Sequence, residues 1–341
     1  MKPDTLIPIS FPVRKPLPNG AALLCADVGG TKTGLALFEL RDGELSILKE
    51  TVYSSKQFDS LSEIVQQFMD ETTHPQRFCI AFAGPVNAGK AKATNLNWGI
   101  DADALSRELN IPQVLVINDL EAEAYGLAAL SKEDLVTIYK AENAQQGNAA
   151  IIAPGTGLGE AGLFWDKTAF HPFATEGGHA DFAPRCELDF ELLHYLQQQF
   201  GHVSWERVIS GPGIHQIYCF LRDVKKWEEP ADLRERMKEN DPSAVIAAAA
   251  AKGSRICEET LRLFVCYLAI EASNLALKLK ATGGIFLAGG ILPKIWNEDL
   301  HKVFLKHFFE VGRLQPLIKA VPVYLVMNPK TALLGAAYFG R

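Results

Sequence analysis

The sequence of 341 residues lacks the patterns that mark several protein classes. Its cysteines are scattered, and no two of them form a Cys-x-x-Cys pair. Disulfide frameworks and zinc sites use clustered or regularly spaced cysteines, so we expect neither. Isolated cysteines in apolar runs are typical of a reducing cytosol, and we expect a cytoplasmic protein in which most of them are small buried side chains. The six are Cys25, Cys79, Cys186, Cys219, Cys257 and Cys266.

Signals for nucleic acid, for a membrane and for export are missing as well. The formal net charge is -6, and no basic block is interleaved with aromatic residues, so nucleic acid is not an expected partner. The strongest membrane candidate, 261–279, contains Arg262, Glu271 and Lys278, which predicts a helix of a soluble protein. Residues 1–20 are rich in proline and lack the apolar core of a signal peptide, so we interpret them as an irregular N-terminal extension.

The composition is that of an ordinary globular protein, with 48% hydrophobic and 22% charged residues. The length suffices for a sizeable core and suggests two domains. We place a small α/β domain at 21–129 plus 322–341 and a large α/β domain at 130–321.

The first half of the chain predicts a mixed α/β sheet. Gly29-Gly30 separates two apolar runs, 22–28 and 31–40, which predicts a hairpin because glycine tolerates the positive φ of a tight turn. Further strands are expected at 45–53, 78–83 and 114–117, and helices at 60–70 and 101–109.

Asn118 and Asp119 directly follow the apolar run 114–117 and precede a stretch rich in helix formers. Open α/β sheets bind ligands at this edge, where a carboxylate can take a proton from a substrate hydroxyl. The alternative is purely structural, because Asn118 with Glu121 fits a capping box that only starts a helix.

The pattern recurs in the second half, where Gly155-Thr156-Gly157 and two further residues separate the apolar runs 149–154 and 160–165. Backbone N–H groups of glycine turns form anion-binding concavities. One such turn by itself would favour a simple hairpin, but two in matching positions predict that polyphosphate is held from both sides.

The remainder of the second half predicts helices and two more strands. Residues 171–185 are rich in loop formers, and helices are expected at 188–199, from Asp241-Pro242 onward and at 258–280. The strand 283–288 ends in Gly289-Gly290, and Pro293 is placed to begin a helix. A strand at 321–327 precedes a short helix, 330–338, which we expect to pack on the first domain.

Polar residues gather beside these glycines. The clusters are Asp27 to Thr31, Asn97-Trp98, Asn118-Asp119, Thr175 to Asp181 and Glu206 to Gly213. Carboxylate, amide and imidazole groups bind hydroxyls, whereas the glycine turns bind phosphates. Asp27 would hold Mg²⁺ through water, because this ion prefers few carboxylates and keeps most of its hydration shell. The combination points to phosphoryl transfer from a nucleotide to a polyol.

With these motifs in this order, the sequence resembles the bacterial glucokinases of the hexokinase/actin-like ATPase superfamily, the group without the zinc-binding cysteine motif. The resemblance covers nearly the whole chain after the extension. The matching stretches are ADVGGTKTGLALF (26–38), Asn97-Trp98, IND (117–119), GTGLG (155–159), EGGHADFAP (176–184), ERVISGPG (206–213) and GGIFLAGGILPK (283–294).

The resemblance implies an α/β fold of the two-domain actin-like ATPase or ribonuclease H-like type with an interdomain cleft. It implies an ATP-dependent glucokinase that uses Mg²⁺, transfers the γ-phosphate to the 6-hydroxyl of glucose at the start of glycolysis, and is a cytoplasmic homodimer.

It also implies roles for single residues. Asp119 would be the general base toward the sugar 6-hydroxyl. The substrate ligands would be Asn97, Asn118, Asp119, Glu176, His179 and Glu206. The nucleotide would be bound at Asp27, Gly29, Gly30, Thr31, Gly155, Thr156, Gly157, Gly289 and Gly290.

Alternatives exist at two levels. His179 alone would be a satisfied structural histidine and Glu206 a surface carboxylate, while Asp181 is expected to orient His179 or to cap local backbone. For the whole chain, the alternatives are a kinase for mannose, fructose or an N-acetylhexosamine, and a non-catalytic sugar sensor. About twenty residues precede the first strand, too few for a helix-turn-helix module, and Asp119 is intact, so the sensor is least favoured.

Overall fold

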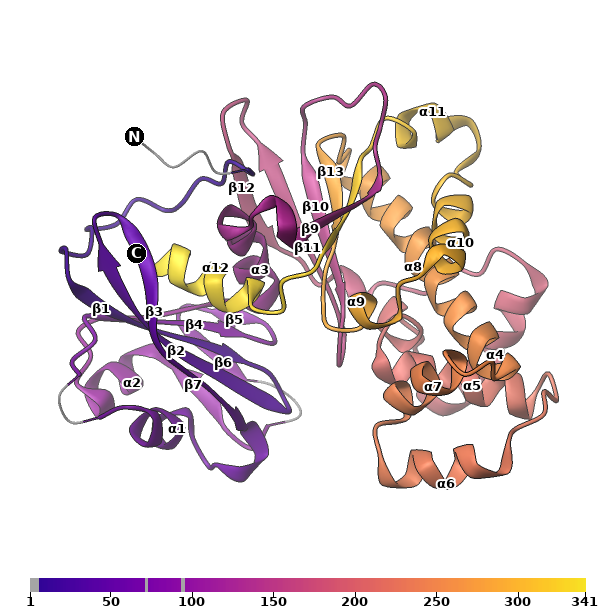
Figure 1. Cartoon of the computed structure of the whole chain (residues 1–341), viewed down its shortest axis with the longest axis horizontal. Helices are drawn as coiled ribbons and strands as arrows, with labels where there is room; N and C mark the ends of the chain where they lie inside the picture. The colour runs from indigo at the N-terminus through magenta and orange to yellow at the C-terminus, as the bar shows by residue number, and fades with distance from the viewer. Residues whose placement is uncertain (1–5, 71–72, 93–95) are drawn as a thin grey trace. The chain divides into compact units, whose positions relative to one another are not determined.

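The computed structural model describes residues 6–70, 73–92 and 96–341. The chain divides into two compact units (Figure 1). Unit 1 comprises Met1–Asp134, Thr168–Ala174 and Asn328–Arg341, and unit 2 comprises Leu135–Lys167 and Thr175–Met327. Each unit contains its own sheet and its own core, and each is described by itself.

Unit 1 is built on a five-stranded sheet of order β3-β2-β1-β4-β8. The strands are β1 (Ala21–Val28), β2 (Lys32–Arg41), β3 (Glu44–Ser54), β4 (Arg77–Phe82) and β8 (Val114–Asn118). The first three form antiparallel hairpins, whereas β4 and β8 run parallel to β1. All five strands confirm the elements predicted from the apolar runs and glycine turns. The parallel strands bring the carboxyl ends of β1, β4 and β8 to one edge.

Helices cover both faces of this sheet. Successive side chains of a strand point to opposite faces, so Leu24 and Ala26 of β1 pack in the core with α1 (Leu61–Phe68), whereas Leu23 and Cys25 pack with α3 (Asp119–Gly126) and α12 (Thr331–Gly340). Two shorter elements complete this unit: α2 (Ala102–Leu109), and a small sheet of β5 (Val86–Asn87), β6 (Lys90–Lys92) and β7 (Gly99–Asp101).

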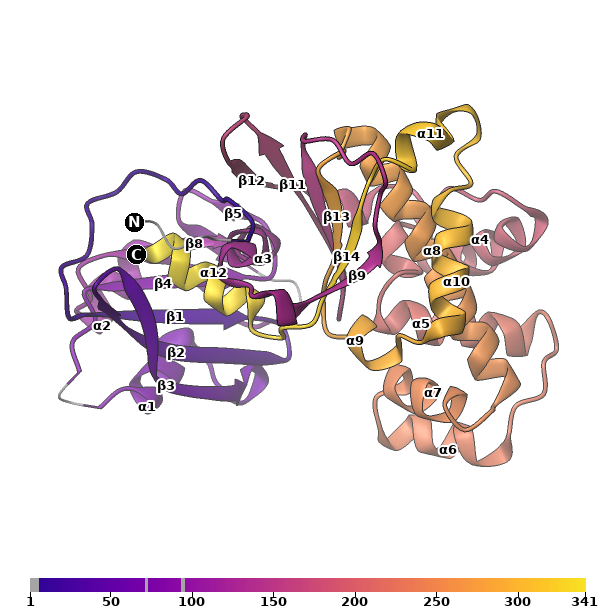
Figure 2. The same ribbon diagram turned by 45° about the horizontal axis from the view of Figure 1, so that its top comes forward.

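The contact between α3 and α12 depends on glycine. A Cβ atom at Gly335 would lie 1.7 Å from the carbonyl oxygen of Ala122, and one at Gly126 would lie 2.0 Å from that of Thr331. The two backbones therefore touch, and α12, drawn in yellow, lies beside α3 in both views (Figures 1 and 2). The C-terminal helix thus packs on the helix that begins at Asp119.

Unit 2 contains five strands in the order β11-β10-β13-β14-β9. They are β11 (Leu158–Trp165), β10 (Ala149–Pro154), β13 (Gly284–Leu287), β14 (Val323–Val326) and β9 (Leu135–Tyr139). β10 and β11 form the predicted antiparallel hairpin, and β13 and β14 extend the sheet in parallel with β10. The edge strand β9 was not predicted.

The helices of unit 2 gather on one side of this sheet (Figure 2). The longest, α8, occupies the core, and it confirms the helix predicted at 258–280. Within the described ranges, α8 alone is long and apolar enough to cross a membrane, and 83% of its apolar window is buried in the fold, as in a core helix. The helices are α4 (Glu187–Phe200), α5 (Gly211–Asp223), α6 (Ala231–Glu239), α7 (Pro242–Ala250), α8 (Arg255–Leu279), α9 (Leu292–Ile295), α10 (Glu298–Phe308) and α11 (Gln315–Ile318).

Residues 171–185, predicted to be loops, contain more regular structure than expected. The strand β12 (Phe170–Ala174) belongs to unit 1, where Phe170 pairs with Ile9 in a parallel bridge. The short helix η4 (Gly177–His179) belongs to unit 2.

Candidate active site

Asn118 is the N-cap of α3. Its side-chain oxygen accepts hydrogen bonds from the backbone N–H groups of Leu120 (3.0 Å) and Glu121 (3.2 Å), and its side-chain nitrogen donates to the carbonyl of Gly84 (3.2 Å). The structural interpretation of Asn118 as a helix start is therefore confirmed. The amide nitrogen carries a second N–H, so the capping role leaves one donor for a ligand.

Asp119 is the first residue of α3, and its side chain is half-buried. It follows the last residue of β8, which pairs with Phe82, and Phe82 in turn pairs with Val28 of β1. Asp27 precedes Val28. The sheet thus places Asp27 and Asp119 at the same edge of unit 1, with β4 between their strands.

The first glycine turn is held by a serine that the sequence analysis did not single out. Gly29 donates its N–H to the carbonyl of Lys32 (2.9 Å), while the Ser55 hydroxyl donates to the carbonyl of Gly29 (2.7 Å) and the Ser55 N–H to that of Thr31 (3.0 Å). These bonds fix the backbone of residues 29–31 next to Asp27.

The second glycine turn lies in unit 2, where it meets the start of a helix. Gly155 donates its N–H to the carbonyl of Gly157 (2.8 Å) and accepts from the N–H of Gly211 (2.9 Å). Gly211 begins α5, whose N-cap is Ser210. The first N–H groups of α5 are already used, because Gly211 donates to Gly155, Gly213 donates to the Ser210 hydroxyl, and Pro212 has no N–H. The helix therefore places the positive end of its dipole beside the turn predicted to bind phosphate, without adding a donor from these residues.

Gly289 and Gly290 lie close to the carboxyl end of β10, the strand that precedes the second glycine turn. The N–H of Ala288 donates to the carbonyl of Ile152 in β10, and a Cβ atom at Gly289 would lie 2.5 Å from the carbonyl oxygen of Pro154. Gly289 also has φ of +82°, which favours glycine. Two predicted nucleotide-binding motifs, 134 residues apart in sequence, thus lie side by side.

Glu206 is bound to the second glycine turn. Its Oε2 accepts a hydrogen bond from the N–H of Leu158 (3.0 Å), and a Cβ atom at Gly157 would lie 2.4 Å from the same oxygen. A freely solvated surface carboxylate would not be held in this way. The structure brings this candidate sugar ligand into contact with a candidate phosphate loop.

The segment that contains Glu176 and His179 packs on the first residue of β11. A Cβ atom at Gly178 would lie 2.1 Å from the carbonyl oxygen of Leu158. Trp205, next to Glu206, donates its N–H to the carbonyl of Ala180 (3.0 Å). The segments that carry Glu176, His179 and Glu206 are therefore joined around the start of β11.

Two other predicted residues have different surroundings. The expectation for Asp181 is wrong, because its carboxylate pairs with His202 (2.7 Å) at the surface and not with His179 or local backbone. Asn97 is exposed, and its amide donates to Asp59 at 3.5 Å. Sequence reasoning missed Asp59 and His202, because nothing in the local pattern identifies either partner.

Comparisons with known proteins identify the family of this chain. The family model described as Glucokinase matches residues 24–341. This chain belongs to the glucokinase family. The glucokinase of Trichormus variabilis is 44% identical over 335 residues, which cover 92% of this chain and 97% of the relative.

Solved structures of glucokinases have the same fold. The glucokinase from an Antarctic psychrotroph has 33% identity and a TM-score of 0.76, covering 93% of this chain and 98% of its own. A ROK family glucokinase from Streptomyces griseus, solved with glucose and AMPPNP, has 20% identity and a TM-score of 0.64, covering 94% and 99%. The predicted family and the α/β fold of the actin-like ATPases are confirmed, and the chain is an enzyme.

The surroundings of Asp27 suit a side chain that binds a hydrated cation through the water molecules of that cation. Its carboxylate is half-buried, and no described residue donates a hydrogen bond to it or forms an ion pair with it. Burial raises its pKa from 3.8 to about 6. No group of three His, Cys, Asp or Glu side chains in the described ranges could hold a metal directly. One unpaired carboxylate suits a hydrated Mg²⁺ better than a closed metal cage.

Replacing Asp27 with asparagine is expected to stabilise the protein without ligands by about 1–2 kcal/mol near pH 7.5, after discounting for partial exposure. The pKa of Asp27 in the folded protein, about 6, lies above the ordinary value of 3.8. Between these two pH values the native state therefore binds more protons than the unfolded state. Wild-type stability therefore falls as the pH rises through this range. Urea unfolding should show a larger advantage of Asp27→Asn near pH 7.5 than near pH 4.5. An equal advantage at both pH values would contradict this.

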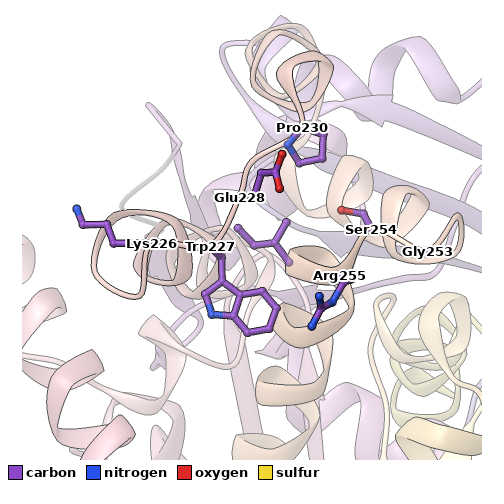
Figure 3. Close-up of a pocket in the computed structure, with 8 residues that line it drawn as sticks. Lys226, Trp227, Glu228, Pro230, Gly253, Ser254 and Arg255 are labelled. Atoms are coloured by element: carbon purple, nitrogen blue, oxygen red, sulfur yellow. The ribbon is translucent and has the colours of Figure 1, made fainter.

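A separate pocket of about 590 Å³ lies in unit 2 (Figure 3). It is formed by the connection between α5 and α6 and by the N-terminus of α8, and the guanidinium of Arg255 lies 6.0 Å from the Trp227 ring. None of the predicted site residues lines it. The lining residues are Lys226, Trp227, Glu228, Pro230, Gly253, Ser254, Arg255 and Ile256.

Proposed function

We propose that this chain transfers the γ-phosphate of ATP to the 6-hydroxyl of glucose, giving glucose 6-phosphate and ADP. The observation that carries the proposal is the contact of Glu206 with the second glycine turn. A carboxylate suited to sugar hydroxyls is held by the N–H of Leu158, the residue that follows this turn. A bound sugar and a bound phosphate would therefore be positioned by the same piece of backbone.

Asp119 is the general base in this proposal. It takes the proton of the 6-hydroxyl as that oxygen bonds to phosphorus. Phosphoryl transfer passes through a loose transition state, in which positioning of the nucleophile contributes alongside proton removal. A carboxylate at the start of α3 is suited to both, because the Asn118 cap fixes the helix backbone there.

The sugar is held by hydrogen bonds to its hydroxyls from Asn97, Asn118, Glu176, His179 and Glu206. A site built from such groups rejects analogues that lack a hydroxyl, since its buried polar groups would then stay unpaired. The half-buried Glu206 fits this role.

The nucleotide is held at three glycine motifs, whose turns let backbone N–H groups approach the phosphates. The motifs comprise Gly29, Gly30 and Thr31, then Gly155, Thr156 and Gly157, and finally Gly289 and Gly290. The N–H groups of Gly29 and Gly155 hold the turns themselves, since they donate to Lys32 and Gly157. Asp27 would hold Mg²⁺ through water, and the bound ion would neutralise phosphate charge.

A cytoplasmic location and a homodimer are part of this proposal. All six cysteines are free thiols, and Cys25, Cys79, Cys257 and Cys266 are buried. Free thiols are the usual state in a reducing compartment, which supports the location. Sedimentation of the purified protein would test the dimer.

The deciding experiment couples ADP release to a panel of sugars: glucose, mannose, fructose and N-acetylglucosamine. We expect the highest kcat/KM with glucose, and excess EDTA should abolish the activity until Mg²⁺ is restored. Equal or better kcat/KM with another hexose would reassign the substrate. Glucose binding without ADP release would indicate a sensor.

A further inference from the structure

Glu160 is a buried acid outside the proposed site. It belongs to β11, two residues after Leu158, and is 2% exposed. Its Oε1 atom has no hydrogen-bond partner in the part of the chain that the structure describes. An unpaired buried polar atom destabilises the folded state, so a buried acid at this position suggests a functional role.

The loop 175–179 lies directly on this side chain. A Cβ atom at Gly177 would lie 2.0 Å from the Oε2 of Glu160 and 2.9 Å from its Cδ. Only glycine allows the loop to come so close. The backbone adds a second connection, because the Thr175 hydroxyl donates to the carbonyl of Glu160 (2.8 Å) and accepts from the N–H of Gly177 (3.3 Å).

Burial favours the protonated form of Glu160 near neutral pH. Burial and the nearby Glu271 of α8 raise its pKa to about 8, and Lys278 opposes this shift. The two oxygens of Glu271 accept hydrogen bonds from Lys278 (2.9 Å) and Asn274 (2.8 Å). The positive charge of Lys278 is therefore paired with the carboxylate of Glu271 and not with Glu160. The loop packed on Glu160 carries two more titratable groups, Glu176 and His179.

We propose that Glu160 is a positioning residue for sugar binding: its buried carboxyl group supports the loop 175–179 and thereby orients Glu176 and His179. The inference about the sugar rests on the function proposed above. The support of the loop does not, because it follows from the packing of Gly177 on the carboxyl group.

A pH dependence follows from this arrangement. Ionisation of Glu160 places a charge beneath Gly177 without a donor to stabilise it, so the loop must shift or admit water. Glucose binding should therefore weaken above about pH 8. Glutamine has the shape of the protonated acid and cannot ionise, so Glu160→Gln should remove this weakening.

The test compares Glu160→Gln and Glu160→Ala by glucose calorimetry, by steady-state kinetics and by amide hydrogen exchange of residues 174–182 without sugar. We expect Glu160→Ala to raise the KM for glucose by about 10-fold, to change kcat less, and to speed exchange of the loop. Glu160→Gln should match the wild type near pH 7. Ser273→Ala is the control, since it shortens another buried polar residue of the same core, whose hydroxyl bonds to Ile270.

A second variant approaches the contact from the loop. Gly177→Ala adds a methyl group against the carboxyl group and should weaken glucose binding, and in combination with Glu160→Ala the loss should be smaller than the sum. Gly34→Ala is its control, because a Cβ atom there meets nothing within 4 Å.

Several results would overturn the inference. The first is a folded Glu160→Ala protein with unchanged hydrogen exchange of the loop and unchanged KM for glucose. The second is a loss of glucose affinity in Glu160→Gln equal to that in Glu160→Ala. The third is a double variant in which the two losses of glucose affinity add. A wild type inactive on every sugar would instead refute the proposed function, and loop exchange alone would then decide whether Glu160 supports the loop.

Discussion

Replacing Asp119 with asparagine is expected to lower kcat by at least ~10²-fold, the low end for general base catalysis. Asparagine nearly preserves the shape of the side chain but cannot take up the proton of the sugar hydroxyl. The KM for glucose should change much less, because the other hydroxyl ligands remain. Steady-state kinetics at saturating Mg²⁺ would measure both constants.

The control for Asp119→Asn is Asp103→Asn. Asp103 lies in the first turn of α2 in the same unit, as Asp119 does in α3, so both variants remove one negative charge from a helix N-terminus. Similar unfolding midpoints with very different kcat values would separate catalysis from helix stability. A folded Asp119→Asn protein with near-native kcat would leave Asp119 with a structural role only.

Replacing Glu206 with alanine is expected to raise the KM for glucose by ~30-fold or more, which corresponds to the loss of one charged hydrogen bond of about 2 kcal/mol. The KM for ATP should rise too. The variant leaves the N–H of Leu158 without its acceptor and opens a space beside Gly157, so the second glycine turn loses its support.

The two KM values distinguish this role from others. Glu191→Ala is the control, since it removes an acid of unit 2 that forms a partly exposed ion pair with Lys225, and such pairs contribute little. We expect it to change neither constant. A Glu206→Ala enzyme with unchanged KM for ATP would show that the turn does not depend on this carboxylate, and unchanged KM for glucose would remove it from the sugar site.

The backbone elements of the candidate site could be predicted because their signals are local. The glycine turns at 29–31 and 155–157 follow apolar strands directly, and the start of α3 is visible in Asn118 and its neighbours. Turn geometry and helix capping depend on residues a few positions apart. The same local information supported two interpretations of Asn118. The structure confirms the capping interpretation, and the role of Asn118 as a sugar ligand stays a prediction.

The rest was hidden because it depends on contacts between distant segments. Asp181 was expected to orient His179, two residues away, or to cap local backbone, yet it pairs with His202, 21 residues away. Ser55 supports the carbonyl of Gly29, 26 residues earlier. No periodicity or spacing rule connects such pairs, because the chain path between them decides whether they meet.

The sequence by itself determined the five strands of the unit 1 sheet, the strands β10, β11, β13 and β14, the glycine turns and the identity of the polar residues next to them, since each depends on neighbours along the chain. Only the tertiary structure decided that Glu206 meets the backbone of Leu158 and that Glu160 lies beneath Gly177. The first pair is separated by 48 residues. Such contacts arise from the packing of whole segments on β11, where burial and close backbone approach select one arrangement among many that the local patterns allow.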